Sequence, residues 1–184
     1  MKFEFSLIYK IAAQDQDHDE IMLKLARTNC TDALVGLGVA GHMSLEFIRE
    51  APSAQQALLH AIKDVKRALP AAQLIEASPD WVGLSDVADL LGVTRQNMRK
   101  LMLTHADTFP SPVHTGSTSV WHLAEVLRFM QQRKMAYPSA LYEVAHVTLQ
   151  LNLERQTALH STAHNKNEVR KFSVRTTPDK TVKA

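Results

Sequence analysis

A short run of polar side chains between Thr94 and Lys100 has the residue types that bind nucleic acid. Arginine and lysine contact guanine or phosphate, whereas asparagine and glutamine form paired hydrogen bonds with adenine. At helical spacing, Met98 points to one side of a helix and its polar neighbours point to the other. The run therefore predicts a helix that reads DNA, with these candidate residues: Thr94, Arg95, Gln96, Asn97, Arg99 and Lys100.

Two short helices joined by a tight turn are expected to position these side chains. Ser85 is placed to cap the first helix, Gly92 allows a sharp turn, and Thr94 is placed to cap the second. Two helices joined in this way form a helix-turn-helix, which puts its second helix into a DNA major groove. The residues expected to point inward are Val87, Ala88, Leu90, Leu91, Val93, Met98 and Leu101.

The region after Met102 predicts a β-hairpin and then another helix. Prolines on both sides of Ser111 exclude a helix there, and short strands can pair around a turn at residues 115–118. A hairpin in this position is a wing, and the following helix, to about Lys134, completes a domain at residues 81–135. Besides Ser85, the expected DNA contacts outside the second helix are His114, Thr115, Ser117 and Thr118.

Residues 1–77 predict an α+β domain. Alternating apolar and polar residues near the N-terminus indicate a strand with one buried face. The order strand, helix, strand, strand, helix, strand is typical of the ferredoxin-like βαββαβ arrangement. Other topologies stay open, because the order of elements does not fix which strands pair. The expected elements are a strand at 2–13, a helix ending near Thr28, strands at 33–39 and 43–48, a helix from Ser53 to Leu69, and a strand at 73–77.

Residues 138–160 predict a long helix with a broad apolar side. A second copy of the chain is the simplest partner for such a side, so the helix is expected to hold a homodimer together. Residues 161–184 lack periodicity and are rich in Lys, Arg, Thr and Asn, so a basic, disordered tail is expected there. The candidate dimerisation residues are Leu141, Val144, Ala145, Thr148, Leu151 and Leu159.

Charge and cysteine content narrow the functional classes. The net charge of the 184 residues is +2, and its distribution is uneven. Residues 1–77 hold 8 Lys and Arg against 10 Asp and Glu, whereas residues 138–184 hold 7 against 4. This asymmetry suits nucleic-acid binding by the C-terminal half. The single cysteine, Cys30, excludes an internal disulfide and a multi-cysteine metal site.

Several other classes of protein are not expected. No apolar run is long enough to span a membrane and no signal peptide is recognisable, so a cytoplasmic protein is expected. Among the histidines only His160 and His164 share a four-residue spacing, and no carboxylate or cysteine completes a metal site. No catalytic constellation is recognisable either, so neither an enzyme nor a bound cofactor is expected.

From Val82 to Met130 the chain resembles the winged helix-turn-helix of the MerR superfamily, including its short excisionase-like members. The matching parts are Leu84–Leu101, the Phe109-Pro-Ser-Pro sequence and Val120–Val126. The resemblance implies that the polar residues at 95–100 face DNA and that residues 115–118 form the wing tip. It also implies a dimer on inverted repeats, joined by a long C-terminal helix.

The chain departs from that family in three respects. A whole domain precedes the helix-turn-helix, the effector cysteines of metal-sensing members are absent, and the wing has neither arginine nor lysine. Promoter remodelling in the manner of MerR is therefore not implied. Phosphate contacts from the wing would come from hydroxyl groups and backbone amides.

The expected function is sequence-specific binding of double-stranded DNA by a homodimeric bacterial or mobile-element transcriptional regulator. One alternative is an excisionase-like architectural protein that bends a recombination site. Another is an antitoxin or adaptor that binds a protein partner through residues 1–77. That first domain is expected to be a sensor or assembly module, for either a small ligand or a protein, and its sequence does not decide between them.

Overall fold

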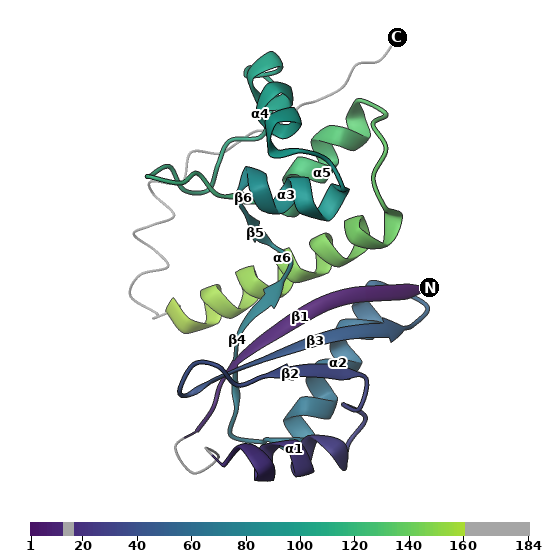
Figure 1. The fold of residues 1–184 in the computed structure, drawn as a ribbon, viewed down its shortest axis with the longest axis vertical. Coiled ribbons are helices and arrows are strands. Elements are labelled where there is room, and N and C mark those ends of the chain that lie inside the picture. The colour runs from purple at the N-terminus through teal and green to yellow at the C-terminus, as the bar shows by residue number, and fades with distance from the viewer. Residues whose placement is uncertain (13–16, 161–184) are drawn as a thin grey trace. The chain divides into compact units, whose positions relative to one another are not determined.

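The computed structural model describes residues 1–12 and 17–160, so the expected basic tail lies outside the described residues. Met1–Asn152 form one compact unit, and a second unit begins at Leu153. Within the described residues the chain combines six helices with a four-stranded antiparallel sheet and a small two-stranded sheet (Figure 1). The expected mixture of helices and strands is therefore present.

The four-stranded sheet has the strand order β2-β3-β1-β4, and every neighbouring pair is antiparallel. Because side chains alternate along a strand, one face of the sheet is apolar. In the central pair Phe5 lies opposite Phe47, and the two rings stack with centroids 5.2 Å apart. The strands are β1 (Lys2–Lys10), β2 (Ala33–Gly36), β3 (His42–Glu50) and β4 (Gln73–Ser78).

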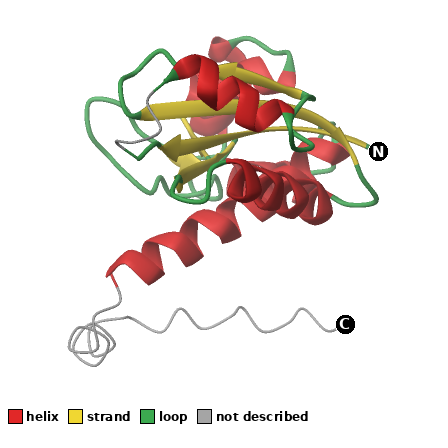
Figure 2. Ribbon diagram, turned by 90° about the horizontal axis from the view of Figure 1, so that it is seen from below, coloured by secondary structure: helices red, strands yellow, loops and turns green. Residues whose placement is uncertain are grey.

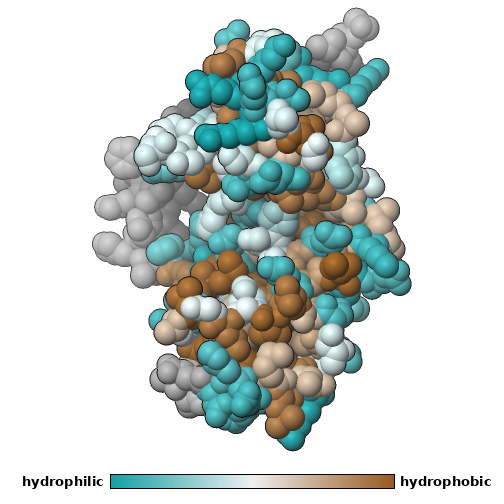
Figure 3. All heavy atoms as spheres, in the orientation of Figure 1, coloured by the Kyte–Doolittle hydropathy of each residue, from teal (hydrophilic) through white to brown (hydrophobic). Residues whose placement is uncertain are grey.

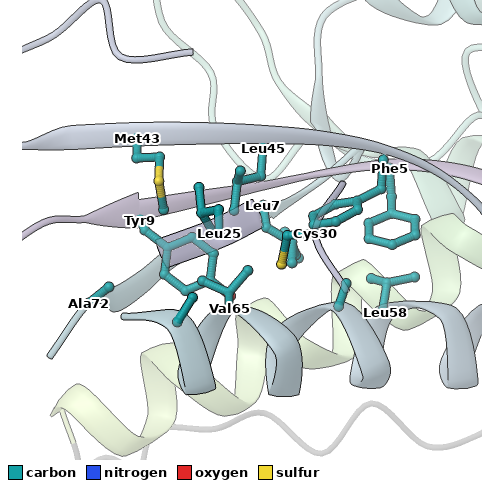
Figure 4. Packing of buried hydrophobic residues seen from close by; sticks show 14 of the residues in the cluster. Phe5, Leu7, Tyr9, Leu25, Cys30, Met43, Leu45, Leu58, Val65 and Ala72 are labelled. Atoms are coloured by element: carbon teal, nitrogen blue, oxygen red, sulfur yellow. The ribbon is translucent and has the colours of Figure 1, made fainter. Parts of the chain in front are cut away.

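Helices α1 (His18–Ala26) and α2 (Ala54–Ala68) cover the apolar face of this sheet (Figure 2). Each helix begins where a side chain accepts backbone N–H groups: Asp17 caps α1 and Ser53 caps α2. Figure 4 shows the resulting core, with Tyr9 and Leu7 directed toward the α2 residue Val65. The burial of these large side chains is the main source of stability for this part of the chain.

A second hydrophobic core joins the remaining elements. Helix α3 (Leu84–Leu91) and helix α4 (Arg95–Thr104) pack with α5 (Leu123–Gln132) around Trp121. Strands β5 (Trp81–Val82) and β6 (Trp121–His122) pair antiparallel beneath them, a small sheet that the sequence patterns did not predict.

Helix α6 (Ser139–His160) spans the range in which a long helix was expected. Within the compact unit it contributes to both cores, since Val144 belongs to the first and Ala145 to the second. Other boundaries differ from the expectation. The second strand ends at Gly36 rather than near residue 39, and α5 ends at Gln132 rather than near Lys134.

Candidate nucleic-acid interface

The turn between α3 and α4 is set by Gly92. Its φ of 65° and ψ of 31° place it in the left-handed region, which glycine adopts at little cost. The N–H of Val93 then donates to the carbonyl of Ala88 at 2.9 Å, which closes the end of α3. Thr94 follows in an extended conformation, and its hydroxyl accepts the N–H of Asn97 at 3.2 Å. Gly92 and Thr94 thus have the places expected for them.

The cap of α3 differs from the expectation. Gly83, not Ser85, precedes the helix, and its N–H donates to the Asp86 carboxylate at 2.7 Å. Ser85 therefore lies in the first turn of α3, where its side chain is exposed. The prediction of a Ser85 cap was wrong, because the helix begins one residue earlier, at Leu84; the Asp86 carboxylate instead accepts the N–H of the residue that precedes the helix.

Helix α4 is held mainly by one buried side chain. Met98 is 3% exposed and packs with Val87 and Ala88 of α3. Leu101 is half-buried against the same core. The expected inward directions of Leu90 and Val93 were wrong, since these side chains are 37% and 41% exposed. Residue 93 belongs to the turn, so helical spacing does not govern its direction.

The other side of α4 is polar and faces solvent. Arg95, Gln96, Asn97, Arg99 and Lys100 are all exposed, and the helix contains no acidic residue. Among residues 1–12 and 17–160, no ion pair involves its two arginines or its lysine. In the orientation of Figure 1, the upper part of the molecule, where this helix lies, is mainly hydrophilic, with some apolar residues among the polar ones (Figure 3). The helix therefore presents three positive charges that are available to an external anion.

The loop after α4 is tied back to the second core. Phe109 contacts both Trp121 and Phe129 edge-on, with ring centroids 6.0 and 5.1 Å apart. The Trp121 indole N–H donates to the carbonyl of Pro110 at 2.9 Å. Beyond these anchors, an isolated β-bridge joins His114 and Val120. The candidate contacts in this loop are all exposed: His114, Thr115, Ser117 and Thr118.

A cavity of about 490 Å³ separates this loop from α4. Arg95 and Leu103 line it from the helix, and Ser117 and Thr118 line it from the loop. The structure thus brings one candidate arginine and two candidate hydroxyls to the same hollow. The remaining candidates of α4 lie outside this cavity.

The expected dimerisation residues of α6 lie largely inside a single chain. Val144, Ala145 and Thr148 are at most 1% exposed, and Leu141 and Leu151 are half-buried against the two cores. Their apolar side is largely covered by the sheet and by the α3–α5 region of the same chain. Only Leu159, in the unit that begins at Leu153, is an exposed member of the set, at 65%.

A buried polar joint lies where α6 crosses the junction between the two cores. We use this name for Asp80, His122, Thr148 and Asn152. The Asp80 carboxylate accepts from Nδ1 of His122 at 2.7 Å and from the Asn152 amide at 2.8 Å. Asn152 also pairs with both backbone groups of Ala77 in β4, at 2.9 and 2.8 Å. The Thr148 hydroxyl donates to the Pro79 carbonyl at 2.7 Å.

Sequence reasoning missed this joint, although a sign of it was present. Thr148 and Asn152 are polar residues four positions apart on the apolar side of α6, so they share one face of the helix. Polar residues on such a face require polar partners, and backbone groups of the 77–80 segment supply them here.

A second polar cluster lies beside α2 and centres on Arg49. Its guanidinium donates twice to Asp32, at 2.8 and 2.9 Å, and once to Asp64 at 3.0 Å. Burial lowers the pKa of Arg49, but hydrogen bonds and charge from the two carboxylates outweigh this and raise it above its ordinary value. Because the carboxylates already occupy this guanidinium, the cluster links β3, α2 and the loop before β2 rather than offering a free charge.

Cys30 and the histidines are the remaining candidates for chemistry among the described residues. Cys30 is buried, and desolvation is the main reason that its thiol pKa is raised. Within the described ranges, no three His, Cys, Asp or Glu side chains gather as metal ligands, and no helix is long and apolar enough to cross a membrane. His164, one of the two spaced histidines, lies outside those ranges.

Comparison with known proteins returned no match to a protein-family model, to a curated protein or to a solved structure.

Proposed function

We propose that this chain is a sequence-specific double-stranded DNA-binding protein, a homodimeric bacterial or mobile-element transcriptional regulator. The observation that carries the proposal is the outward side of α4. It has three cations, two amide side chains and no acid, and none of the cations is ion-paired within the described part of the chain. Side chains of these types match the donors and acceptors of base edges and phosphates.

The proposal assigns different tasks along α4. Gln96 and Asn97 lie in the first turn, where a recognition helix commonly meets base edges, so we assign base reading to them. Arg99 and Lys100 are assigned to phosphates, whose contacts fix the register of the protein on DNA. Arg95 and the loop hydroxyls, which share a cavity, are assigned to the adjacent backbone.

The finer fold belongs to the same proposal. We assign residues 81–135 to a winged helix-turn-helix, with the His114–Val120 bridge as the base of the wing. We assign residues 1–77 to a ferredoxin-like domain, because the strand order β2-β3-β1-β4 with both helices on one face is that of a βαββαβ fold.

The buried polar joint links the four-stranded sheet of residues 1–77 to the region that contains α4. Asn152 bonds to β4 of the sheet, while Asp80 bonds to His122 at the start of α5. A ligand or partner that shifts the sheet would therefore act on the α3–α5 region through fixed hydrogen bonds. This arrangement suits a regulator whose first domain is a sensor or assembly module.

Selection of bound sequences from random double-stranded DNA, with the full chain, tests the proposal. We expect one enriched motif, and the spacing and orientation of its halves to report the symmetry of the bound protein. Inverted halves fit a regulator, whereas direct repeats fit an architectural excisionase-like protein. Absence of any enriched motif would contradict sequence-specific binding.

Two double variants then locate the interface. We expect Arg95→Ala with Arg99→Ala to weaken binding of the selected DNA about 100-fold, from roughly 1–2 kcal/mol for each lost contact. Lys63→Ala with Lys66→Ala is the matched control, because it removes two exposed charges from α2. Equal affinities of the two double variants would place the interface elsewhere.

A further inference from the structure

The two edge strands of the four-stranded sheet, β4 and β2, differ in whether another element bonds to their outer side. At the β4 edge, Asn152 of α6 bonds to the N–H and the carbonyl of Ala77, as a neighbouring strand would. At the other edge β2 pairs with β3 alone, and no described element adds a further strand to it. The sheet therefore has one closed edge and one open edge.

The open edge also lacks the usual protection against pairing. Exposed edges commonly bear charged residues or proline, which discourage the addition of another strand. Residues 33–41 contain neither a charged residue nor a proline. Leu34 is 69% exposed and Val39 is 66% exposed. Ile48 of β3, a diagonal neighbour of Leu34 on the same face, is 59% exposed. In Figure 3 the sheet region carries a broad apolar patch.

A hollow lies beside Leu34 on this face. It measures about 410 Å³ and is lined by Ile8, Gly36, Gly38, Val39 and Ser44, among others. A side chain at Gly36 would meet the Ser44 hydroxyl, which would have to move to make room for it. The edge thus combines a projecting leucine with an apolar hollow two residues away.

We propose that β2 pairs antiparallel with β2 of a second copy of this chain, around a two-fold axis at Val35. In this register, Leu34 of each copy lies directly opposite Gly36 of the other and on the same face of the joined sheet. Each leucine then enters the hollow of the other copy, and the two sheets become one continuous sheet of eight strands. Main-chain hydrogen bonds supply affinity, as in other cases of strand addition.

A second copy fits this edge better than an unrelated strand does. The projecting leucine and the hollow are self-complementary under two-fold symmetry, which is the requirement for an isologous interface. Because the edge is uncharged, self-pairing brings no like charges together. The apolar side of α6, the other candidate for dimerisation, is largely covered within one chain up to Asn152. The biological role of this dimer rests on the proposed function: it would bring the α4 helices of two copies to one DNA molecule. The pairing itself does not depend on DNA binding.

Sedimentation equilibrium of the full chain tests the pairing. We expect a dimer for the native sequence and at least a tenfold higher dissociation constant for Leu34→Lys, because the variant places a charge in the partner's hollow. Leu23→Lys on α1 is the matched control, since Leu23 is 52% exposed and lies on a helix rather than on the edge strand β2. A monomeric native chain, or equal dissociation constants for Leu34→Lys and Leu23→Lys, would overturn the proposal.

A cysteine at residue 35 tests the register. On the axis, the two copies of residue 35 have Cα atoms roughly 4.5–5.5 Å apart, within the range that a disulfide requires. We expect Val35→Cys to form a covalent dimer under mild oxidation and Leu23→Cys to remain monomeric on a denaturing gel; the native Cys30 is buried. Equal cross-linking of the two variants would overturn the register.

These outcomes are distinct from those that test DNA binding. If the native chain dimerises through Leu34 but selects no DNA, the pairing stands and the proposed function fails. If it selects DNA while remaining monomeric, the proposed function stands and the pairing fails.

Discussion

The buried polar joint and the outward side of α4 both consist of polar side chains, but they differ in their partners. Asp80, Thr148 and Asn152 are at most 1% exposed, and each has hydrogen-bond partners within the chain. The cations of α4 are exposed and have no ion-pair partners in the described residues. Both sets are polar groups on helices, so residue type alone does not separate them.

The difference separates structural from binding roles. A buried polar group without a partner costs stability, so the joint is expected to be energetically coupled to folding. An exposed polar group is hydrogen-bonded to water, so its removal changes the free energy of unfolding little. Substitutions in the joint should therefore change the free energy of unfolding, whereas substitutions on α4 should change DNA binding alone.

The largest effect is expected from Asp80→Ala. This variant leaves His122 and Asn152 without their shared acceptor in a buried site, which should lower the free energy of unfolding by about 3–4 kcal/mol. Urea denaturation followed by circular dichroism measures the change. Asp89→Ala, which removes an exposed carboxylate from α3, serves as the control and should shift it by less than about 0.5 kcal/mol. Similar changes in the free energy of unfolding for Asp80→Ala and Asp89→Ala would show that the buried carboxylate contributes no more to stability than an exposed one.

An intermediate effect is expected from Asn152→Leu. The backbone N–H and carbonyl of Ala77 lose their partners, and the leucine restores part of the loss through apolar burial. A decrease of about 2 kcal/mol in the free energy of unfolding is expected. Gln150→Leu on the exposed side of α6 provides the comparison and should be nearly neutral. A neutral Asn152→Leu would show that the amide does not stabilise the β4 edge.

The smallest effect on stability is expected from Gln96→Ala combined with Asn97→Ala. Because both side chains are exposed, the free energy of unfolding should change by less than about 0.5 kcal/mol. Discrimination between the selected DNA and a scrambled duplex should nevertheless fall about tenfold or more, from loss of base contacts. Competition binding with the two duplexes measures this. Retained discrimination would assign base reading to other residues.

Local patterns in the sequence predicted much of the secondary structure. The alternation in β1 and the spacing of apolar residues in α2 each reflect a single buried face, so local order is sufficient to recognise them. The glycine and threonine of the α3–α4 turn were equally recognisable, because Gly92 needs a left-handed backbone and Thr94 a helix cap.

What sequence reasoning missed depends on contacts between distant residues. The small β5–β6 sheet joins segments about forty positions apart, and strands of two residues leave no periodicity to detect. The apolar side of α6 was assigned to a second copy because the sequence does not say which surface covers it. In the structure the two cores of the same chain cover that side. Thr148 and Asn152 are consistent with this, because they bond to polar groups of the chain, whereas a dimer interface of apolar side chains would offer them no such partners.

The positions of the two tryptophans have a spectroscopic consequence. Trp81 in β5 and Trp121 in β6 are the only tryptophans of the chain, and both lie in the small sheet beneath α3–α5. The indole of Trp121 is also bonded to Pro110, at the start of the loop that carries the candidate hydroxyls. Tryptophan emission, excited selectively so that Tyr9 of β1 does not contribute, therefore reports on this region and not on the four-stranded sheet. Such emission can follow events at the loop without an attached label.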